Sequence, residues 1–239
     1  MTPDTNQDEK QSGHLPFVTI KYAQTLDGRM ATATGDSQWI SGPDSLRLAH
    51  QLRAEHDAIM VGIGTVLADD PQLNVRLISG NDPLRVIVDS RLRTPLAARV
   101  LTGNAAPRTL IATTALADHA RRQEVERLGA QIVTLPTHAD SSQLDLALLL
   151  AELKTRGIQS VLVEGGPGII TSLLAQRLAD RLIVAIAPKL IGSGKEAVGD
   201  LGIRRLADAL CFETFSTQRL GDDIIFDGRI AWENESSAP

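Results

Sequence analysis

The sequence predicts an α/β protein with a mixed, mostly parallel sheet and helices on both faces of that sheet. Strand-like and helix-like segments alternate along the 239 residues, and a 43% hydrophobic composition can fill a substantial core. The last two strand-like segments follow one another with only a short turn between them. Parallel strands need crossover connections, whereas a short turn joins antiparallel strands. We therefore expect a parallel region that ends in a C-terminal antiparallel pair.

Short apolar runs bounded by turn residues indicate ten strand-like segments, from which we expect a sheet of about nine strands. Several are rich in Val and Ile, which favour strands. The last two are expected to form the antiparallel pair through a turn at 220–222. In chain order, the strand-like segments are 17–24, 30–34, 58–62, 84–89, 109–113, 131–135, 160–163, 182–187, 212–219 and 223–232.

Helices are expected between these strands. Their starts are indicated by a capping Ser or Thr or by a Gly-Pro pair, and their ends by Gly or Pro. The expected helices begin at 42–44, at a capping Thr65, at Leu116, at about Ser142 and at Ile169, and the third and fourth end at Gly129 and Gly157.

Composition and charge argue against several classes of function. A net charge of −5 and a pI near 5.5 argue against binding to nucleic acid or to anionic membranes, although local basic clusters can still hold phosphate groups. No apolar run approaches the ~20 residues of a membrane span, and the polar N-terminus has no signal-peptide core. We expect a cytoplasmic protein with one domain at 15–233 and disordered tails at 1–14 and 234–239.

Cysteine and histidine are too sparse or too scattered for several kinds of chemistry. Cys211 is the only cysteine, so no internal disulfide is expected, and its apparently apolar segment predicts a core position. The five histidines lack the His-x-Glu and Pro-Cys-x-x-Cys pattern of zinc base deaminases. We expect no metal site and no base-deaminase activity.

The most informative motif is SVLVEGGPGIITSLL at 160–174, where a strand ends at Glu164 and a glycine-rich turn leads into a helix. Free N–H groups at a helix N-terminus favour phosphate without a basic side chain. The motif lacks the third glycine of a dinucleotide fingerprint, and GSGKE at 192–196 lacks the spacing of a nucleoside-triphosphate loop, so GSGKE is expected to be a surface turn. The turn at 164–168 is either an anion cradle beside a carboxylate or a simple strand-to-helix turn.

Ligands of open α/β sheets bind beyond the carboxyl ends of the strands, so the residues after each strand are the candidates. Each candidate has a plain structural alternative. Trp39 either packs in the core or stacks on a flat ring, and Arg53 and Arg76 are either surface charges or phosphate ligands. The strand ends with suitable side chains are 23–39, 62–76, 89–93 and the turn at 164–168.

Five strings follow one another in a specific order: KYAQTLDGRMATATGDSQWIS, LRAEHDAIMVGIGTVLADDPQLNVR, LRVIVDSRLRTP, VEGGPGIITSLL and IAPKLIGSG. With this order and spacing the chain resembles the reductase domain of bacterial bifunctional riboflavin-biosynthesis deaminase/reductases and the free-standing archaeal pyrimidine reductases of that pathway. The similarity runs from Phe17 to Trp232. It implies a dihydrofolate-reductase-like fold.

The resemblance also implies NADPH as cofactor, a phosphoribosyl pyrimidine as substrate and a homodimer. Ser90 with Arg91 or Arg93 would bind the 2′-phosphate of NADPH, and Arg53 with Arg76 would bind the 5′-phosphate of the substrate. The implied cofactor contacts are Ala23, Trp39, Thr65, Asp69, Ser90, Arg91, Arg93, Gly165, Gly166, Pro167, Gly168 and Ile169, and the implied substrate contacts are Ser37, Arg53, Leu73, Arg76 and Glu164.

The reaction implied is reduction of a ribosylamino-pyrimidine to its ribitylamino form by hydride from NADPH, after the ribose ring opens to an imine. Glu164 would bind ribose hydroxyls, or supply a proton if burial raises its pKa, and Lys21 is the second candidate for the proton. The substrate is either 5-amino-6-(5-phosphoribosylamino)uracil, as in bacteria, or the non-deaminated 2,5-diaminopyrimidinone, as in archaea and fungi. SQWIS is similar to the bacterial form, whereas MVGIGTVLADDP and VDSRLR are similar to the archaeal form.

Two other classes remain open. A dihydrofolate or pterin reductase would share NADPH and the fold, but it would have no use for two phosphate-facing arginines. A non-catalytic phosphosugar-binding module would bind the pyrimidine and never oxidise NADPH.

Overall fold

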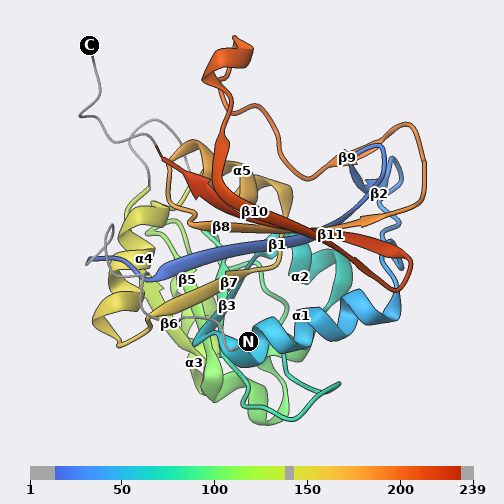
Figure 1. Ribbon diagram of the computed structural model, residues 1–239. Coiled ribbons are helices and arrows are strands. Elements are labelled where there is room, and N and C mark those ends of the chain that lie inside the picture. Colours follow the sequence, from blue (N-terminus) through green and yellow to red (C-terminus); the bar gives the residue numbers. More distant parts are fainter. Residues whose placement is uncertain (1–13, 138–142, 233–239) are drawn as a thin grey trace, which may run out of the picture.

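The computed structural model describes residues 14–137 and 143–232, so the predicted tails lie outside the described residues except for His14. Nine strands form one sheet through the middle of the molecule (Figure 1), parallel throughout except that β11 pairs antiparallel with β8 and β10 pairs antiparallel with β11. The predicted mixed, mostly parallel sheet is confirmed. In spatial order the strands are β10 (Cys211–Leu220), β11 (Asp223–Ala231), β8 (Arg181–Ala187), β1 (Phe17–Thr25), β7 (Ser160–Val163), β3 (Ala58–Gly62), β4 (Leu84–Val88), β5 (Thr109–Thr113) and β6 (Gln131–Thr134).

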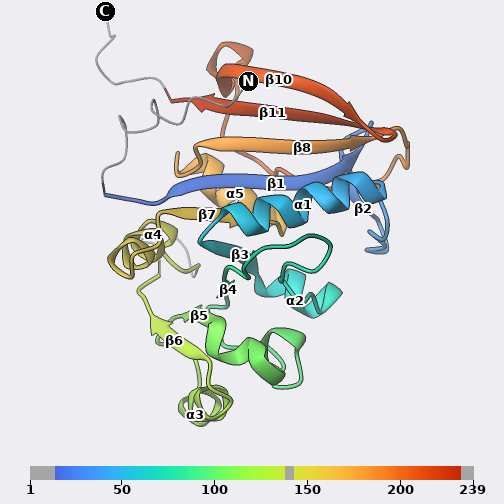
Figure 2. The ribbon, with the colours of Figure 1, turned by 60° about the horizontal axis from the view of Figure 1, so that its bottom comes forward.

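Helices cover both faces of the sheet. They are α1 (Pro43–Glu55), α2 (Ile63–Asp69), α3 (His119–Arg127), α4 (Leu146–Thr155) and α5 (Pro167–Ala175), with short 3₁₀ turns at Arg99–Leu101, Gly103–Arg108 and Leu206–Asp208. Successive strand side chains point to opposite faces, so Met60 of β3 packs with α4 and α5, whereas Ile59 and Val61 pack with α2 and α3. Figure 1 shows α1 and α5 on opposite sides of the sheet, and Figure 2 shows α1 in front of the sheet, running roughly along β1.

An aspartate caps each of the helices α3 and α4, and α3 begins later than the sequence predicts. The Asp118 carboxylate accepts a hydrogen bond from the Arg121 backbone N–H at 2.9 Å, and Asp145 caps α4 in the same way. α3 therefore starts after Asp118 and not at Leu116. The α4 start predicted near Ser142 lies outside the described residues.

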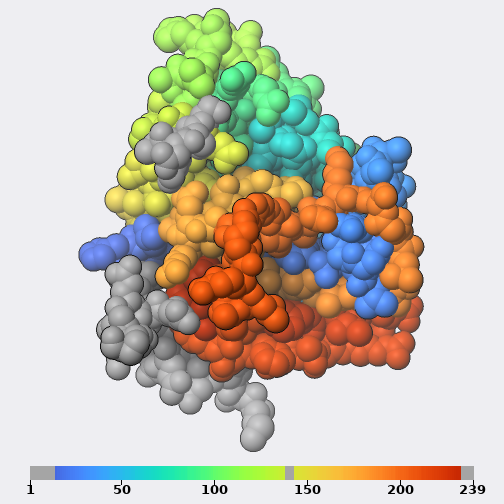
Figure 3. Space-filling model, turned by 90° about the horizontal axis from the view of Figure 1, so that it is seen from above, coloured from blue at the N-terminus to red at the C-terminus, as the bar shows by residue number. Residues whose placement is uncertain are grey.

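The prediction of a surface turn at 192–196 is wrong in part. Gly194–Glu196 is a strand, β9, that pairs antiparallel with β2 (Arg29–Thr32). This two-stranded unit is the β2–β9 ribbon, and Figure 3 shows its blue and orange segments side by side at the surface. The local sequence did not indicate this strand, because its partner among the described residues, β2, lies more than 150 residues upstream.

The predicted core position of Cys211 is wrong, because Cys211 is exposed at the start of β10. β10 is the edge strand of the sheet, and nearly all of its residues are exposed. An apolar neighbourhood in the sequence does not show whether a strand lies at the centre or at the edge of a sheet.

Candidate active site

A cavity of about 550 Å³ opens at the carboxyl ends of β3, β4 and β7, where candidate residues are expected. α2, the loop after β4 and the turn before α5 form its walls, and the β2–β9 ribbon lies at one side. The structure therefore brings together predicted residues from four separate parts of the chain. The predicted residues that line the cavity are Ser37, Thr65, Asp69, Ser90, Arg93, Glu164, Gly165, Gly166, Pro167, Gly168 and Ile169.

The other predicted residues lie outside this lining. Trp39 is 66% exposed, and its carbonyl accepts a hydrogen bond from Lys189 Nζ at 2.7 Å, so it is not a core residue. Leu73, in contrast, is 2% exposed and packs with the core on the α2 face. The predicted residues outside the lining are Lys21, Ala23, Trp39, Arg53, Leu73, Arg76 and Arg91.

The turn between β7 and α5 has the geometry of an anion cradle. Gly165 has a φ of +112°, which glycine adopts without strain, and the Gly166 N–H donates to Thr65 Oγ1 at 3.1 Å. Thr65 lies in the first turn of α2, so it is not the helix cap that the sequence predicts. Its hydroxyl instead supports the cradle. No neighbouring atom lies within 4 Å of the position that a Cβ of Gly168 would take, so the backbone at the start of α5 is open to a phosphate group.

Glu164 forms a bidentate ion pair with Arg53 of α1 beside this cradle. Arg53 Nε and Nη2 donate to the two Glu164 carboxylate oxygens at 2.8 and 2.5 Å, and both side chains are nearly buried. Burial opposes ionisation of Glu164, yet the Arg53 guanidinium holds the pKa of the carboxyl below its usual value. The condition under which Glu164 would supply a proton, a pKa raised by burial, is therefore not met, and Glu164 is a carboxylate at neutral pH.

The ion pair with Glu164 distinguishes the two predicted phosphate-binding arginines, Arg53 and Arg76. The remaining Arg53 amino group donates to the Asn74 carbonyl at 3.1 Å, so the guanidinium is satisfied inside the protein. Arg76 is exposed, and its Nη1 donates to Asn74 Oδ1 at 3.0 Å. Of the two, Arg76 is the arginine that a phosphate from solvent can reach.

Lys21, in the middle of β1, lies level with Glu164 just beyond the end of β7. The register pairs Ile20 of β1 with Val163 of β7, so the next residue of each strand falls side by side. Burial lowers the pKa of Lys21, and Arg53 lowers it further, while Glu164 and Asp223 raise it. An ammonium with a lowered pKa gives up its proton more readily than an exposed lysine.

His50 belongs to this cluster although the sequence did not single it out. It is fully buried on α1, its Nδ1 accepts the Arg76 backbone N–H at 3.1 Å, and its Nε2 has no partner among the described residues. Burial, with Arg53 and Arg76 nearby, lowers its pKa to about 4, so the imidazole is neutral at neutral pH. Its position three residues before Arg53, on the same face of a predicted helix, is the signal that could have identified it.

Lys195 is a charged lining residue that the sequence did not single out. It belongs to β9 and lines the cavity from the β2–β9 ribbon. Within the described residues, no group of His, Cys, Asp and Glu is placed to hold a metal ion. Separately, none of the described helices is long and apolar enough to cross a membrane.

Comparison with known proteins identifies the family of this chain. The family model described as the RibD C-terminal domain matches residues 16–226. The riboflavin biosynthesis protein RibD of Aquifex aeolicus is 39% identical over 211 residues, which cover 88% of this chain and 56% of that protein. The 2,5-diamino-6-ribosylamino-4(3H)-pyrimidinone 5′-phosphate reductase of Methanothermobacter thermautotrophicus is 43% identical over 216 residues, which cover 88% of this chain and 96% of that protein.

Solved structures agree with this result. RibD of Acinetobacter baumannii superposes with a TM-score of 0.79 at 32% identity, covering 92% of this chain and 60% of that one. A dihydrofolate reductase of Enterococcus faecalis superposes with a TM-score of 0.51 at 10% identity, which shows the fold alone. This chain spans about half the length of the RibD relatives that it matches. Because the match covers nearly all of the described sheet, the chain belongs to the RibD C-terminal domain family and has a dihydrofolate-reductase-like fold.

Proposed function

We propose that the protein is an NADPH-dependent reductase of riboflavin biosynthesis, which converts the ribosyl group of 5-amino-6-(5-phosphoribosylamino)uracil into the ribityl group. One observation carries the proposal: a single cavity joins an open phosphate cradle at α5 to the Glu164 carboxylate. A dinucleotide held at the cradle would therefore share one cavity with that carboxylate. The relatives named RibD and pyrimidinone-phosphate reductase support the choice of reaction.

The cavity residues fit NADPH. The open Gly168 backbone suits the diphosphate, and the loop after β4 presents Ser90 and Arg93 for a 2′-phosphate. That loop is shaped by Asp89, whose carboxylate accepts hydrogen bonds from the Thr94 N–H at 2.7 Å and from the Thr94 hydroxyl at 2.8 Å. When bound, the cofactor would supply the hydride.

The chain's own side chains would orient the sugar and handle protons. The Glu164 carboxylate would accept hydrogen bonds from ribose hydroxyls and stabilise positive charge that develops at the anomeric carbon. Lys21 would donate the proton that the sugar ring oxygen needs when the ring opens to the imine. Arg76 would bind the 5′-phosphate, while Arg53 holds Glu164 in place.

A second candidate is the same reaction on the non-deaminated 2,5-diamino-6-ribosylamino-pyrimidinone 5′-phosphate. The archaeal relative named for that substrate is 43% identical and is matched over 96% of its length, which favours this reading. The exocyclic group of the pyrimidine distinguishes the two substrates, and the sugar phosphate is common to both.

One assay separates the candidates. NADPH consumption is measured with the deaminated pyrimidine, the diamino pyrimidine and dihydrofolate side by side, and again with NADH in place of NADPH. We expect turnover with the deaminated pyrimidine and a preference for NADPH. Turnover with the diamino compound alone would transfer the assignment to the second candidate. Turnover with dihydrofolate alone, or binding of a pyrimidine without any NADPH consumption, would overturn the proposal.

We also propose a cytoplasmic homodimer. β10 is an edge strand with nearly all residues exposed, including Phe215 at 67%, and long exposed edges tend to pair with another chain. Light scattering is expected to give twice the chain mass of 25.6 kDa. A particle of one chain mass at micromolar concentration would contradict the homodimer.

A further inference from the structure

Lys195 and Arg93 are the two cationic side chains that line the cavity among the described residues. Arg93 stands after β4, and Lys195 stands on the β2–β9 ribbon, so they come from different walls. A diphosphate and a 2′-phosphate would place negative charge at two points of a bound NADPH. The proposed function gives Arg93 the 2′-phosphate as its ligand, whereas it gives Lys195 no ligand.

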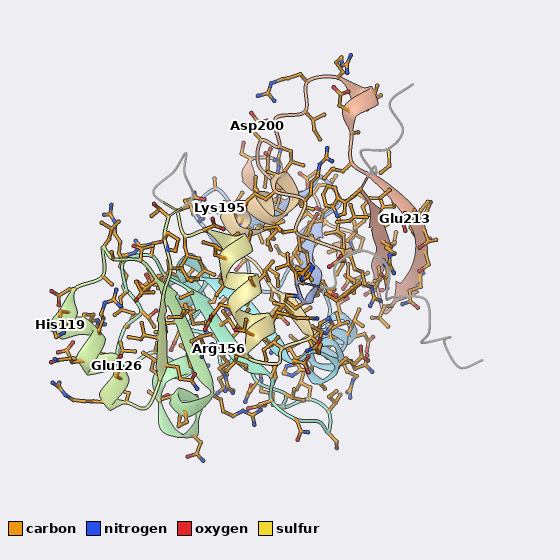
Figure 4. The ribbon with its side chains drawn as sticks, turned by 90° about the vertical axis from the view of Figure 1, so that its left-hand side faces the viewer. His119, Glu126, Arg156, Lys195, Asp200 and Glu213 are labelled. Atoms are coloured by element: carbon orange, nitrogen blue, oxygen red, sulfur yellow. The ribbon has the colours of Figure 1, made fainter. Side chains whose placement is uncertain are left out.

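The fold places Lys195 in a defined position. In the ribbon, Lys195 pairs with Ala31, and its Nζ would lie 3.3 Å from a Cβ built on Gly35. Gly35 has a φ of +96°, so this turn both requires glycine and leaves room for the ammonium. Within the part of the chain that the structure describes, Lys195 forms no hydrogen bond or ion pair with a neighbouring residue. Lys195 is labelled in Figure 4.

The positive charge of Lys195 acts on Asp69, another residue that lines the cavity. Loss of solvent around Asp69 raises the pKa of that carboxyl, and Lys195 acts in the opposite direction. Asp69 ends α2 and lines the same cavity. Lys195 therefore offsets a negative charge that would otherwise repel a phosphate.

The segment after β9 is tied to the cradle. The Gly199 N–H donates to Thr171 Oγ1 at 2.8 Å, and the Thr171 hydroxyl donates to the Pro167 carbonyl at 2.7 Å. These bonds connect the segment that follows β9 to α5. The ammonium and the open backbone of Gly168 thus contribute positive potential to one cavity from two sides.

We propose that Lys195 is a further cofactor-binding residue, whose ammonium binds the diphosphate of the dinucleotide held at the α5 cradle. A lysine is a flexible point charge that suits phosphate oxygens, and the exposed side chain can move toward a ligand. This assignment rests on the proposed NADPH-dependent function. It separates the two cations by role: Arg93 for the 2′-phosphate that only NADPH carries, and Lys195 for the diphosphate that NADPH and NADH share.

Dissociation constants for NADPH and NADH test this division, measured by nicotinamide fluorescence on Lys195→Gln, Lys195→Arg, Arg93→Gln and a control, Lys154→Gln. Lys154 lies on α4 and donates to Gln159 Oε1 at 2.7 Å, and it does not line the cavity. We expect Lys195→Gln to weaken both cofactors by about tenfold, the loss of one charge-assisted hydrogen bond. Lys195→Arg should restore most of the affinity, Arg93→Gln should weaken NADPH alone, and Lys154→Gln should change neither.

Several results would overturn the assignment. Unchanged affinity for both cofactors in Lys195→Gln would do so, as would weakened NADPH binding with normal NADH binding, or a raised KM for the pyrimidine phosphate alone. A lowered melting temperature in Lys195→Gln that Lys195→Arg does not rescue would point to a structural role of the ribbon and would also reject it. Wild-type protein that binds neither cofactor would instead reject the proposed function itself.

Discussion

Replacing Glu164 with Gln is expected to reduce turnover at least about 100-fold, while the dissociation constant for NADPH stays within about twofold of wild type. The carboxylate is ionised because Arg53 holds its pKa below the usual value. The amide keeps the shape of the side chain but removes the negative charge that would stabilise a cationic sugar. The cradle at the start of α5 does not depend on that charge, so cofactor binding should persist.

Steady-state turnover with saturating pyrimidine and NADPH, together with a cofactor titration, measures both quantities. The matched control is Glu126→Gln on α3, an exposed position labelled in Figure 4. Near-normal turnover in Glu164→Gln would remove Glu164 from the mechanism. A large loss of NADPH affinity would instead place Glu164 at the cofactor.

Replacing Arg53 with Met is expected to lower the free energy of unfolding by about 3–5 kcal/mol at neutral pH, the usual effect of leaving one partner of a buried ion pair uncompensated. Met fills most of the volume of the arginine stem, so the loss reports the charge more than the packing. The Asn74 carbonyl also loses a donor. Urea denaturation at pH 7 measures the change.

The pH dependence of this variant should differ in sign from that of wild type. In wild type the pKa of Glu164 is lowered in the folded state, so the stabilisation is present above the unfolded pKa and is lost as the pH falls through the folded pKa. Without Arg53, burial dominates and raises the pKa of Glu164 in the folded variant. The folded variant then binds one more proton than the unfolded chain does. Its stability relative to wild type should therefore rise as the pH falls toward the pKa of a free carboxyl.

A double variant separates the charge from other effects. Arg53→Met with Glu164→Gln removes both charges, and it should recover much of the stability lost in Arg53→Met alone. If the double variant is as unstable as the single one, the loss comes from packing or from Asn74. Wild-type stability of Arg53→Met would mean that the ion pair carries little energy.

Local sequence patterns accounted for most of the fold. Glycine and proline ended the helices, and short apolar runs located the strands, because backbone conformation depends strongly on neighbouring residues. The predicted starts of helices were less accurate than their ends. An aspartate such as Asp118 or Asp145 caps a helix only where the backbone enters the helix, and the local sequence does not show that point. Cys211 was misplaced because burial depends on which strand lies at the sheet edge.

The candidate site was partly predictable for a similar reason. The parallel order of the strands brings their carboxyl ends to one edge, so Thr65, Ser90 and the 164–168 turn meet at one cavity, as expected from the sequence. Arg53 and Arg76 were expected to act together on one phosphate. In the structure both arginines donate to Asn74, but Arg53 is also paired with Glu164, whereas Arg76 is exposed. Their joint binding of one phosphate stays a prediction.

The sequence by itself determined the alternation of strands and helices, the glycine turn after β7, the position of the cavity at the strand ends and the family resemblance. Only the tertiary structure decided that Arg53 pairs with Glu164, 111 residues away, and that Lys195 reaches the cavity from a ribbon strand. The physical reason is that a pKa and a ligand contact depend on which charges lie within a few ångströms. Sequence periodicity gives the face on which a side chain lies, whereas the packing of distant segments sets its neighbours.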